Sequence, residues 1–465
     1  MRIVAPIGLL ALLALLTVVI VVSLSSDRPS VARCEPNRAR PGEASTFYVD
    51  SAHGSDSNHG TSPRQAWRTL ARVGRGGFRD GDTLLLRGGE RFEGTICVGR
   101  ANVSATARGG GLTIRSYGGG RATIAAPPHT DGIAAINVGV HLAGVNLIGR
   151  HDVCNENPSN GYRDGTAGIR VEARDLDGTL APALTVTHAD LRRFCQGVVV
   201  VSDDARSRLA GVRISHVTAH DNSDAGIWTY DRARAEQLIA DVRVTHTRAY
   251  RNGYRGGIML FGVDGGNVSH SVAYANARQA GGGVGIWAFD SRRIVFAHNE
   301  SFGNGSPEIT DDGDGFDFDR GVSHSVMFDN YSHDNGGIGL LVCSCNGGEA
   351  PFYRMHDITL RSNVSRNDGS SGQPSLYVNG GEPMTAIRIL GNRVESARGD
   401  GPLVNLTGCR DCTPSQMADV GSGPYTSVSV RGNTFVARAG KPILEKHLGP
   451  RAIFDLRDNV WRSGG

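Results

Sequence analysis

From about residue 184 onward, the chain repeats a short pattern of hydrophobic and polar positions. In each unit an alternating strand ends in His, an Asn follows six residues later, and an apolar strand led by Gly comes next. The first clear unit has His216, Asn222 and the strand 226–231. Later units keep this order, with His246, Asn252 and 257–261, then His270, Asn276 and 285–290, then His298, Asn304 and 315–319, and finally Asp329, Asn335 and 337–341. The pattern predicts short strands separated by tight turns.

The asparagines of this repeat recur every 24 to 31 residues, a period typical of solenoid coils. Two or three short strands per coil cannot bury their own apolar face, so successive coils must stack. We therefore expect an all-β fold, a right-handed parallel β-helix, as one domain over residues 47–462. Residues 65–73 have apolar positions at helical spacing and predict a short capping helix. The Leu spacing of leucine-rich repeats is absent, and a propeller needs about four strands per 40 residues.

The recurring His and Asn residues receive a structural interpretation. His216, His246, His270 and His298 share one repeat position, so their rings are expected to stack at a corner of the coils. The Asn column is expected to hold turns, because Asn tolerates the left-handed conformation and bonds to local backbone.

Composition narrows the classes of function. The formal net charge is only +3, and no basic stripe with interleaved aromatic residues is present, so nucleic-acid binding has little support. The 64 glycines, which follow no collagen period, fit a chain with many tight turns. Lys441 and Lys446 are the only lysines, which argues against a lysine base in catalysis.

The N-terminal 24 residues have the pattern of a targeting segment. Residues 3–24 are almost continuously apolar, follow Arg2, and are long enough to cross a bilayer. A cleaved signal peptide and a retained signal-anchor both fit this segment, 1–24. Residues 25–46, rich in Ser, Arg and Pro, are expected to form a linker. We expect a secreted or cell-envelope protein, a monomer, that contacts a membrane only through its N-terminal segment.

Eight cysteines, an even number, favour disulfides in an exported chain. The couple Cys343 and Cys345 is expected to pair with the couple Cys409 and Cys412. The alternative is a zinc site built from four thiolates. The long separation of the two couples and an extracellular setting make zinc the less favoured interpretation.

The N-terminal region carries a family resemblance. The residues concerned are 48–50 (Tyr-Val-Asp), 54–56 (Gly-Ser-Asp), 60–61 (Gly-Thr), Pro63 and 67–70 (Trp-Arg-Thr-Leu), followed by 81–84 (Gly-Asp-Thr-Leu) and the Asn-x-x-x-Gly-Ile coils. This set resembles secreted right-handed parallel β-helix proteins of the pectate-lyase-like superfamily. The resemblance covers residues 47–462 and implies a polysaccharide or cell-envelope glycan as partner. Members include polysaccharide lyases, glycoside hydrolases, epimerases, adhesins and phage spikes; the Gly-His-Gly and Arg-Ile-Lys motifs of polygalacturonases are absent.

Alternation along the Gly-led strands predicts which side chains face outward. The positions expected to point into the core are Ile227, Ile258, Ile286, Phe316 and Ile338. The first outward column then contains Trp228, Met259, Trp287, Asp317 and Gly339, and the second contains Tyr230, Phe261, Phe289, Asp319 and Leu341. One face of the coils is therefore expected to be an aromatic band that ends in two aspartates.

An exposed aromatic band is unfavourable on a soluble surface unless something covers it. Aromatic rings stack on sugar rings, so the band predicts a glycan groove. Its expected substrate-binding platforms are Trp228, Tyr230, Trp287 and Phe289. Asp290 is expected to bind substrate at the edge of this groove, with Asp224 and Asp231. The alternative is that a loop, such as residues 151–183, packs over this face.

The stretch 311–320 (Asp-Asp-Gly-Asp-Gly-Phe-Asp-Phe-Asp-Arg) contains the candidate chemistry. Asp317 and Asp319 lie two residues apart on one strand face, so their Cα atoms are about 6.5 to 7 Å apart. This spacing suits the acid/base pair of an inverting glycosidase, and close like charges raise one pKa, as a general acid requires. Asp314 is expected to assist. Arg320 and His333 are further catalytic candidates, although the repeat alone aligns His333 with His220.

A cation site is the competing interpretation. Asp312, Asp314 and Asp317 offer closely spaced carboxylate oxygens among glycines, which suits Ca²⁺. Calcium could be structural, or it could neutralise a uronate in a polysaccharide lyase or epimerase, with Arg320 or Tyr230 as the base. A third possibility is a non-enzymatic surface protein that binds glycans. The sequence leaves these alternatives open behind hydrolysis of glycosidic bonds, which is the first expectation.

Overall fold

The structure is a computed structural model that describes most of the chain between residues 44 and 463. The described residues are 44–75, 78–79, 81–99, 111–150, 154–156, 163–176, 178–180, 183–233, 237–277, 283–305, 312–344, 354–396, 401–408, 424–449 and 451–463. They all belong to one compact unit, Val31–Gly465. The apolar segment 3–24 and most of the linker lie outside the described residues. Within the described residues, no helix is both long and apolar enough to span a membrane.

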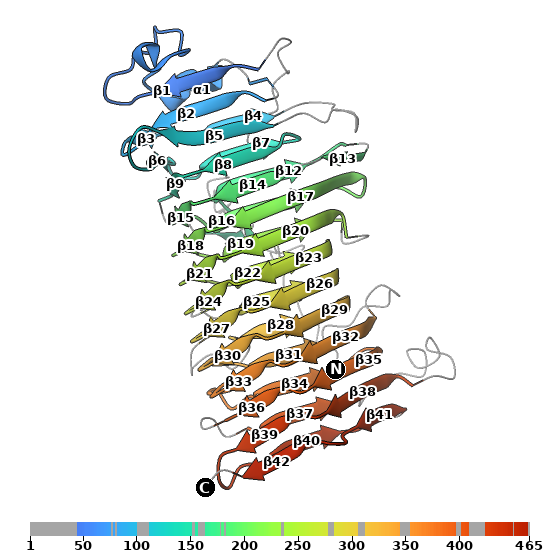
Figure 1. Cartoon of the computed structure of the whole chain (residues 1–465). Coiled ribbons are helices and arrows are strands. Elements are labelled where there is room, and N and C mark those ends of the chain that lie inside the picture. Colours follow the sequence, from blue (N-terminus) through green and yellow to red (C-terminus); the bar gives the residue numbers. More distant parts are fainter. Residues whose placement is uncertain are drawn as a thin grey trace, which may run out of the picture. The chain divides into compact units, whose positions relative to one another are not determined.

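Three parallel sheets make up the described region (Figure 1). The 15-stranded sheet contains β1 (Thr46–Val49), β2 (Thr83–Arg87), β5 (Leu112–Tyr117), β8 (Val140–Ala143), β14 (Leu184–Thr187), β17 (Ser207–Ser215), β20 (Ile239–Thr245), β23 (Val263–Ser269), β26 (Arg292–Ala297), β29 (Ser323–Phe328), β32 (Met355–Arg361), β35 (Met384–Leu390), β38 (Thr426–Arg431) and β41 (Ala452–Asp455), with β13 (Gly178–Leu180) beside β17.

The 13-stranded sheet contains β3 (Arg91–Glu93), β6 (Ala122–Ala125), β9 (Val145–Ile148), β15 (Asp190–Arg192), β18 (Thr218–His220), β21 (Arg248–Tyr250), β24 (Val272–Tyr274), β27 (Glu300–Phe302), β30 (Tyr331–His333), β33 (Val364–Arg366), β36 (Arg393–Glu395), β39 (Thr434–Ala437) and β42 (Val460–Ser463). The 12-stranded sheet contains β4 (Ile96–Gly99), β7 (Ile133–Ile136), β12 (Ala167–Ala173), β16 (Gln196–Ser202), β19 (Ala225–Asp231), β22 (Gly256–Phe261), β25 (Val284–Phe289), β28 (Phe316–Phe318), β31 (Leu340–Cys343), β34 (Leu376–Asn379), β37 (Val404–Thr407) and β40 (Leu444–His447). A small antiparallel pair, β10 (Asn155–Glu156) and β11 (Arg163–Asp164), lies outside these sheets.

Each full coil contributes one strand to each sheet. After β19 the chain passes through β20 and β21 before β22 returns to the 12-stranded sheet and pairs with β19 in parallel. The predicted parallel β-helix is thus confirmed. The predicted capping helix at 65–73 is present as α1 (Leu70–Arg75), which starts later. Trp67 forms a β-bridge with Val49, so the chain between the 3-10 turn η1 (Pro63–Gln65) and α1 stays extended.

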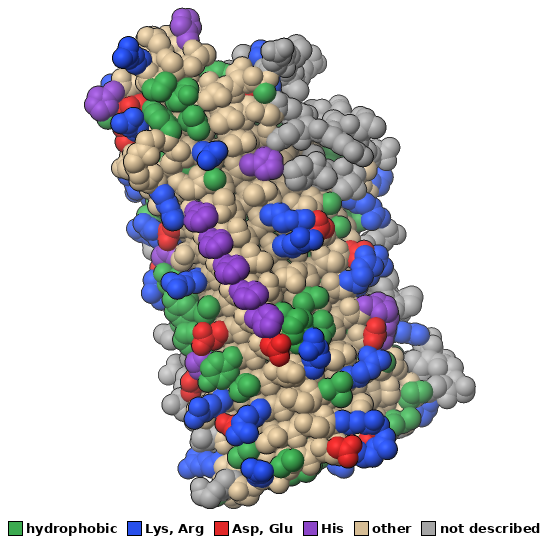
Figure 2. Space-filling model, in the orientation of Figure 1, with side chains coloured by type: hydrophobic (Ala, Val, Ile, Leu, Met, Phe, Trp, Pro, Cys, Tyr) green, Lys and Arg blue, Asp and Glu red, His purple; other side chains and the backbone are tan. Residues whose placement is uncertain are grey.

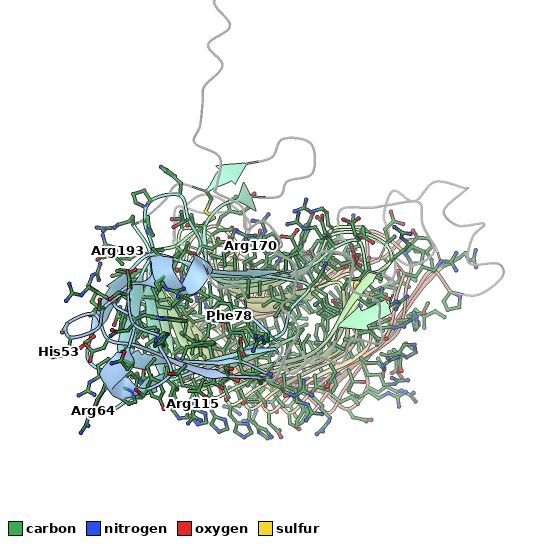
Figure 3. All side chains as sticks on the ribbon, turned by 90° about the horizontal axis from the view of Figure 1, so that it is seen from above. His53, Arg64, Phe78, Arg115, Arg170 and Arg193 are labelled. Atoms are coloured by element: carbon green, nitrogen blue, oxygen red, sulfur yellow. A yellow bond between two sulfur atoms is a disulfide. The ribbon has the colours of Figure 1, made fainter. Side chains whose placement is uncertain are left out.

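Inward-facing side chains form one continuous apolar core. Ile227, Ile258, Ile286 and Phe316 share one register position and are at most 1% exposed. The buried cluster to which they belong extends along the coils from the first strand to β39. Figure 3 looks down the stack and shows Arg170 of the 12-stranded sheet and Arg115 of the 15-stranded sheet on opposite sides of it. Burying each such apolar side chain contributes about 1.5 to 3 kcal/mol, which no single coil could provide for itself.

The predicted histidine stack is confirmed, and it begins one coil earlier, at His188. Neighbouring ring centroids from His188 to His298 lie between 4.9 and 5.2 Å apart. The rings form the purple diagonal in Figure 2. All of these histidines adopt positive φ, for example 53° at His216, so they occupy the left-handed corner between two sheets.

The predicted asparagine column is present, but its expected basis is wrong: the residue before each Asn, such as Arg251 or Ala275, adopts the left-handed conformation, and the Asn side chains bond to neighbouring coils instead of to local backbone. The Asn252 side-chain amide donates to Asn276 Oδ1 at 3.0 Å, and the Asn276 amide donates to Asn304 Oδ1 at 3.0 Å. This chain of hydrogen bonds continues through Asn335 to Asp368. A second column, which sequence reasoning did not identify as such, contains Asn299, Asn330, Asn363, Asn392, Asn433 and Asn459. Both columns satisfy side chains that would be costly to bury unpaired.

One predicted register is wrong. Phe316 pairs with Leu340, not with Ile338, so the outward residues of that coil are Leu341 and Cys343 instead of Gly339 and Leu341. A slip of two residues keeps every side chain on the same face, and the alternating pattern alone therefore cannot detect it.

The cysteines form disulfides where the structure describes them. Cys154 and Cys195 are bonded, with their Cα atoms 5.4 Å apart. Cys97 and Cys343 each take part in a disulfide as well, and the described part of the chain contains no free cysteine. The predicted pairing between the two cysteine couples involves Cys345, Cys409 and Cys412, which lie outside the described residues.

Candidate functional site

The acidic stretch of the repeat forms the strand β28 and its two ends. Phe316 and Phe318 point inward and are fully buried, and Phe318 packs against Phe296 with ring centroids 5.0 Å apart. These two anchors fix the strand, so Asp317 between them must face outward. Asp311 lies outside the described residues, and Asp312 precedes the strand.

Asp317 is flanked by apolar residues of the neighbouring coils, Trp287 on one side and Leu341 on the other. Its side chain is almost completely buried, and its Oδ1 atom has no hydrogen-bond partner among the residues that the structure describes. Burial raises the pKa of Asp317 well above the usual value, and the charges of Asp319 and Asp314 raise it further. The environment therefore favours the protonated acid.

Asp319 follows β28 and has a different environment. Its backbone N–H donates to the Ala288 carbonyl oxygen at 3.0 Å, and its Oδ1 accepts a hydrogen bond from the Arg320 N–H at 2.7 Å. Burial raises the pKa of Asp319 to about 7, against the lowering effect of that hydrogen bond and of the Arg320 charge. Near neutral pH this carboxyl group is therefore divided between its two protonation states.

Asp314 lies at the start of the strand and is completely buried. Its Oδ1 accepts a hydrogen bond from the Ile338 N–H at 2.5 Å, whereas its Oδ2 finds no hydrogen-bond partner within the described ranges. Burial, followed by the charge of Asp312, raises the pKa of Asp314 well above the usual value. Its environment therefore favours the protonated acid.

Arg320 is held on the outward face by two contacts. Its Nη2 donates to Asp290 Oδ2 at 3.4 Å, and its guanidinium group lies 4.7 Å from the centre of the Phe289 ring. Both charged side chains are about nine-tenths buried. A guanidinium held against a carboxylate stays protonated, which argues against Arg320 as the base of a lyase. Its position suits orientation of Asp319 and stabilisation of that carboxylate.

The structure places His333 on a different sheet from the aspartates. It ends β30 of the 13-stranded sheet, and its ring stacks on Phe302 with centroids 4.8 Å apart. Its Nε2 lies 3.2 Å from Glu300 Oε1, and its Nδ1 lies 2.9 Å from Asp334 Oδ2. The repeat, which also aligns His220 with this position, accounts for His333 without a catalytic role.

The aromatic band faces outward as predicted, but it is not exposed. Trp228, Tyr230 and Trp287 are 1%, 2% and 9% exposed, and Phe289 is partly buried. Together with Val199, Val201, Met259 and Phe261 they form a second apolar cluster, separate from the core of the coils. The expected open aromatic groove is therefore wrong, and burial supports the alternative that the face is covered. The loop named as the cover, residues 151–183, is wrong in part, because Ala167–Ala173 form β12 of the 12-stranded sheet itself. Residues 151–153, 157–162, 177 and 181–182 lie outside the described residues.

Polar residues at the margin of the band hold it in place. Arg255 packs 4.4 Å from the centre of the Trp228 ring and forms an ion pair with Asp224 at 2.8 Å. Trp287 Nε1 donates to the Arg255 carbonyl oxygen at 3.1 Å. Asp224, expected at the edge of a groove, is instead fully buried just before β19, and Asp231 is buried at the opposite end of that strand.

The predicted cation ligands do not converge. Among the described residues, one group of three potential metal ligands has its ligand atoms within 4.8 Å of one another. This group contains Asp50, His53 and Glu90 and lies in the N-terminal region. Asp312, Asp314 and Asp317 form no such group. Glu90 accepts hydrogen bonds from the backbone N–H and the hydroxyl of Ser51, and Asp50 accepts hydrogen bonds from backbone N–H groups of the following loop. These bonds explain the cluster as a structural feature that stabilises the loop.

Sequence reasoning did not identify Asp368, a titratable residue that acts on Asp314. Asp368 replaces Asn at the end of the first asparagine column, and its Oδ1 accepts from the Asn335 amide at 2.8 Å. Burial raises the pKa of Asp368 to about 6, and its charge also acts on Asp314. Its spacing from Asn335 was a usable signal, since it matches the period of the repeat.

Comparisons with known proteins agree with this fold. The sequence family described as "Right handed beta helix region" matches residues 167–348. A lacto-N-biosidase from Bifidobacterium longum subsp. longum is 24% identical over 429 residues, which cover 70% of this chain and 26% of that protein. The chain therefore spans about a quarter of the length of this relative.

Solved structures give the same result. The GH136 lacto-N-biosidase from Eubacterium ramulus superposes with a TM-score of 0.63 at 16% identity, covering 90% of this chain and 68% of that one. The A-module of the mannuronan C-5 epimerase AlgE4 from Azotobacter vinelandii superposes with a TM-score of 0.50 at 15% identity, covering 90% and 96%. At these identities the likeness concerns the fold. The resemblance to right-handed parallel β-helix proteins is thus confirmed.

Proposed function

We propose that this protein is a glycoside hydrolase that cleaves a glycan with Asp317 and Asp319 as its acid/base pair. The observation that carries the proposal is the contrast between two carboxyl groups on one strand face. Asp317 has an oxygen without a hydrogen-bond donor in an apolar setting, whereas Asp319 receives the Arg320 N–H. Environments that separate two neighbouring pKa values are how enzymes assign an acid and a base.

In this proposal Asp317 donates a proton to the leaving oxygen, because burial and like charges keep it protonated. Asp319 is the ionised partner that activates a water, because the backbone and guanidinium group of Arg320 favour its charge. Their Cα atoms are about 6.5 to 7 Å apart, a spacing compatible with a water between the reacting groups. Asp314 supports the pair as a buried neutral acid, and Arg320 positions Asp319.

The similarity to two lacto-N-biosidases supports hydrolysis ahead of lyase or epimerase chemistry. For the whole protein we propose a glycan partner and, from the apolar segment 3–24, a secreted or cell-envelope location. Calcium bound by Asp312, Asp314 and Asp317 stays a proposal with less support, since raised pKa values favour protons on these groups.

The test is a screen of the purified chain on neutral and acidic glycans, including the p-nitrophenyl β-glycoside of lacto-N-biose. New reducing ends without the ultraviolet absorbance of an unsaturated uronate indicate hydrolysis. New reducing ends together with that absorbance indicate a lyase, and inversion at C-5 without cleavage indicates an epimerase. Asp317→Asn should abolish turnover, whereas the control Asp357→Asn, on the exposed surface of β32, should not. Absence of any product, with glycan binding that survives Asp317→Asn, would favour a non-enzymatic binding protein.

A further inference from the structure

The outward face of the 12-stranded sheet changes character at Asp317. The coils before it contribute the buried aromatic band. The register then continues from Asp317 to Leu341, Tyr377 and Asn405. The parallel column beyond Cys343 continues to Asn379 and Thr407. Leu341 and Cys343 are buried, but all four outward residues of β34 and β37 are half-buried and polar or amphipathic. On the N-terminal side, Phe289 is the member of the aromatic band that is partly buried, so near the aspartates most of the accessible part of this face lies on their C-terminal side.

Tyr377 is positioned as a rigid aromatic surface. It packs against the small apolar cluster of Ile338, Leu341 and Cys343 while remaining partly accessible. Neighbouring strands are about 4.8 Å apart, so its Cα lies roughly 10 Å from that of Asp317. Tyrosine offers a flat apolar ring and a hydroxyl group, a combination that suits the faces and hydroxyls of a sugar.

The next residues along this face provide hydrogen-bonding groups. Thr407 donates its hydroxyl to Asn405 Oδ1 at 3.1 Å, which orients the Asn405 amide and leaves its N–H donors for other partners. Ser344 bonds to the backbone oxygen of Asn379, not to its side chain. At the following strand, His447 and Glu445 engage each other at 2.8 Å. A strip of amide and hydroxyl groups thus begins two strands from Asp317 and ends at the contact between His447 and Glu445.

We infer that the glycan is held on this polar strip, with Tyr377 as its stacking surface and Asn379 and Asn405 as its hydrogen-bonding partners. The inference rests on the proposed function, because it supplies the binding subsites for the reaction at Asp317 and Asp319. It moves the substrate away from Trp228, Tyr230 and Trp287, whose rings are buried and hence unavailable for stacking without displacement of their cover. The aromatic band is then a structural support for the site.

The experiment compares Tyr377→Ala, Tyr377→Phe and Asn405→Ala with controls from the other two sheets. Tyr274→Ala removes a half-buried ring from β24, and Asn267→Ala removes a half-buried amide from β23. With the p-nitrophenyl β-glycoside of lacto-N-biose, Tyr377→Ala should raise KM roughly tenfold and leave kcat within about threefold. Tyr377→Phe should keep most of the affinity, and both controls should keep the wild-type KM. Thermal melting checks that each variant is folded.

Binding of free lacto-N-biose, measured by calorimetry, tests glycan binding on the polar strip separately from the proposed hydrolase activity. If wild type cleaves the probe and KM is the same in Tyr377→Ala, Asn405→Ala and the controls, the inference is overturned and the proposed hydrolase stands. If wild type binds the disaccharide without cleaving it, loss of binding in Tyr377→Ala but not Tyr274→Ala still supports the strip. If wild type binds neither lacto-N-biose nor any glycan of the screening panel, both claims are overturned.

Discussion

Asp319 accepts a hydrogen bond from the backbone N–H of Arg320 at 2.7 Å. The adjacent guanidinium group is held by Asp290 and by the face of the Phe289 ring. Asp317, two residues earlier, receives no donor at its buried Oδ1 from any residue that the structure describes. Burial opposes the charge of both carboxyl groups, and Arg320 offsets part of this effect at Asp319.

Replacing either member of this pair should remove catalysis without unfolding the protein. A general acid or base typically contributes about 10² to 10⁴-fold to the rate, so Asp317→Asn and Asp319→Asn should each lower kcat by that order. KM should change little, because neither substitution alters the polar strip. Steady-state kinetics and a melting curve for each variant check this expectation. A variant that retains more than about a tenth of the wild-type kcat would contradict its assigned role.

The pH dependence of the rate should reflect the ionisation of Asp319 and Asp317, and replacing Arg320 should shift that dependence. The base must be ionised, so activity should rise with pH through the pKa of Asp319, about 7, and fall again when Asp317 loses its proton. The positive charge of Arg320 lowers the pKa of Asp319. Arg320→Gln should therefore move the rising limb to higher pH, and Arg320→Lys should restore it in part. An unchanged limb in Arg320→Gln would show that Arg320 does not act through Asp319.

The stability that protonated Asp319 contributes should fall as the pH rises from about 4 to 7. The pKa of Asp319 is about 7 in the folded chain, above its ordinary value near 4, so the folded state binds the additional proton. The contribution of this proton to the free energy of unfolding is fully present below about pH 4. It is lost between about pH 4 and 7, by at most about 1.4 kcal/mol per pH unit. Melting temperatures measured across this range should decline less in Asp319→Asn than in wild type. An equal decline in both proteins would contradict the raised pKa.

Removal of divalent cations tests the competing interpretation directly. Because Asp312, Asp314 and Asp317 do not converge, and because the last two have raised pKa values, EDTA followed by dialysis should leave turnover and melting temperature unchanged. The control adds CaCl₂ and, separately, MgCl₂ to the dialysed protein. Loss of activity that CaCl₂ restores and MgCl₂ does not would instead support a calcium-assisted reaction.

The repeat determined most of the fold in advance. Alternating strands and a constant His-to-Asn spacing predicted the coils, the stack from His216 to His298 and the alignment of the asparagines, because each follows from local geometry repeated in every coil. Burial of the asparagines and their bonds between coils were not predicted. The position of Leu340 opposite Phe316 was not predictable in this way, since a shift of two residues preserves the alternation.

Accessibility was the property that the sequence could not supply. Trp228 and Trp287 point away from the core as predicted, yet both are buried, because burial also depends on what packs over a sheet face. The same limitation hid Tyr377, whose partial exposure depends on what packs against its strand. The position of Asp317 between two buried phenylalanines was predictable, whereas the degree of burial of Asp317 and Asp319, and hence the raised pKa of each, required the neighbouring coils.

The asparagine column should contribute more to stability than the histidine stack beside it. Asn276 donates to Asn304 Oδ1 and to the Ala249 carbonyl oxygen, both at 3.0 Å, and its Oδ1 accepts from Asn252. Asn276→Ala would leave buried groups of neighbouring coils unsatisfied, at about 1 to 3 kcal/mol for each. The matched control His246→Ala removes an exposed ring and should change stability far less. Chemical denaturation of both variants measures the difference, and equal midpoints would mean that the asparagine column is not what holds successive coils together at this corner.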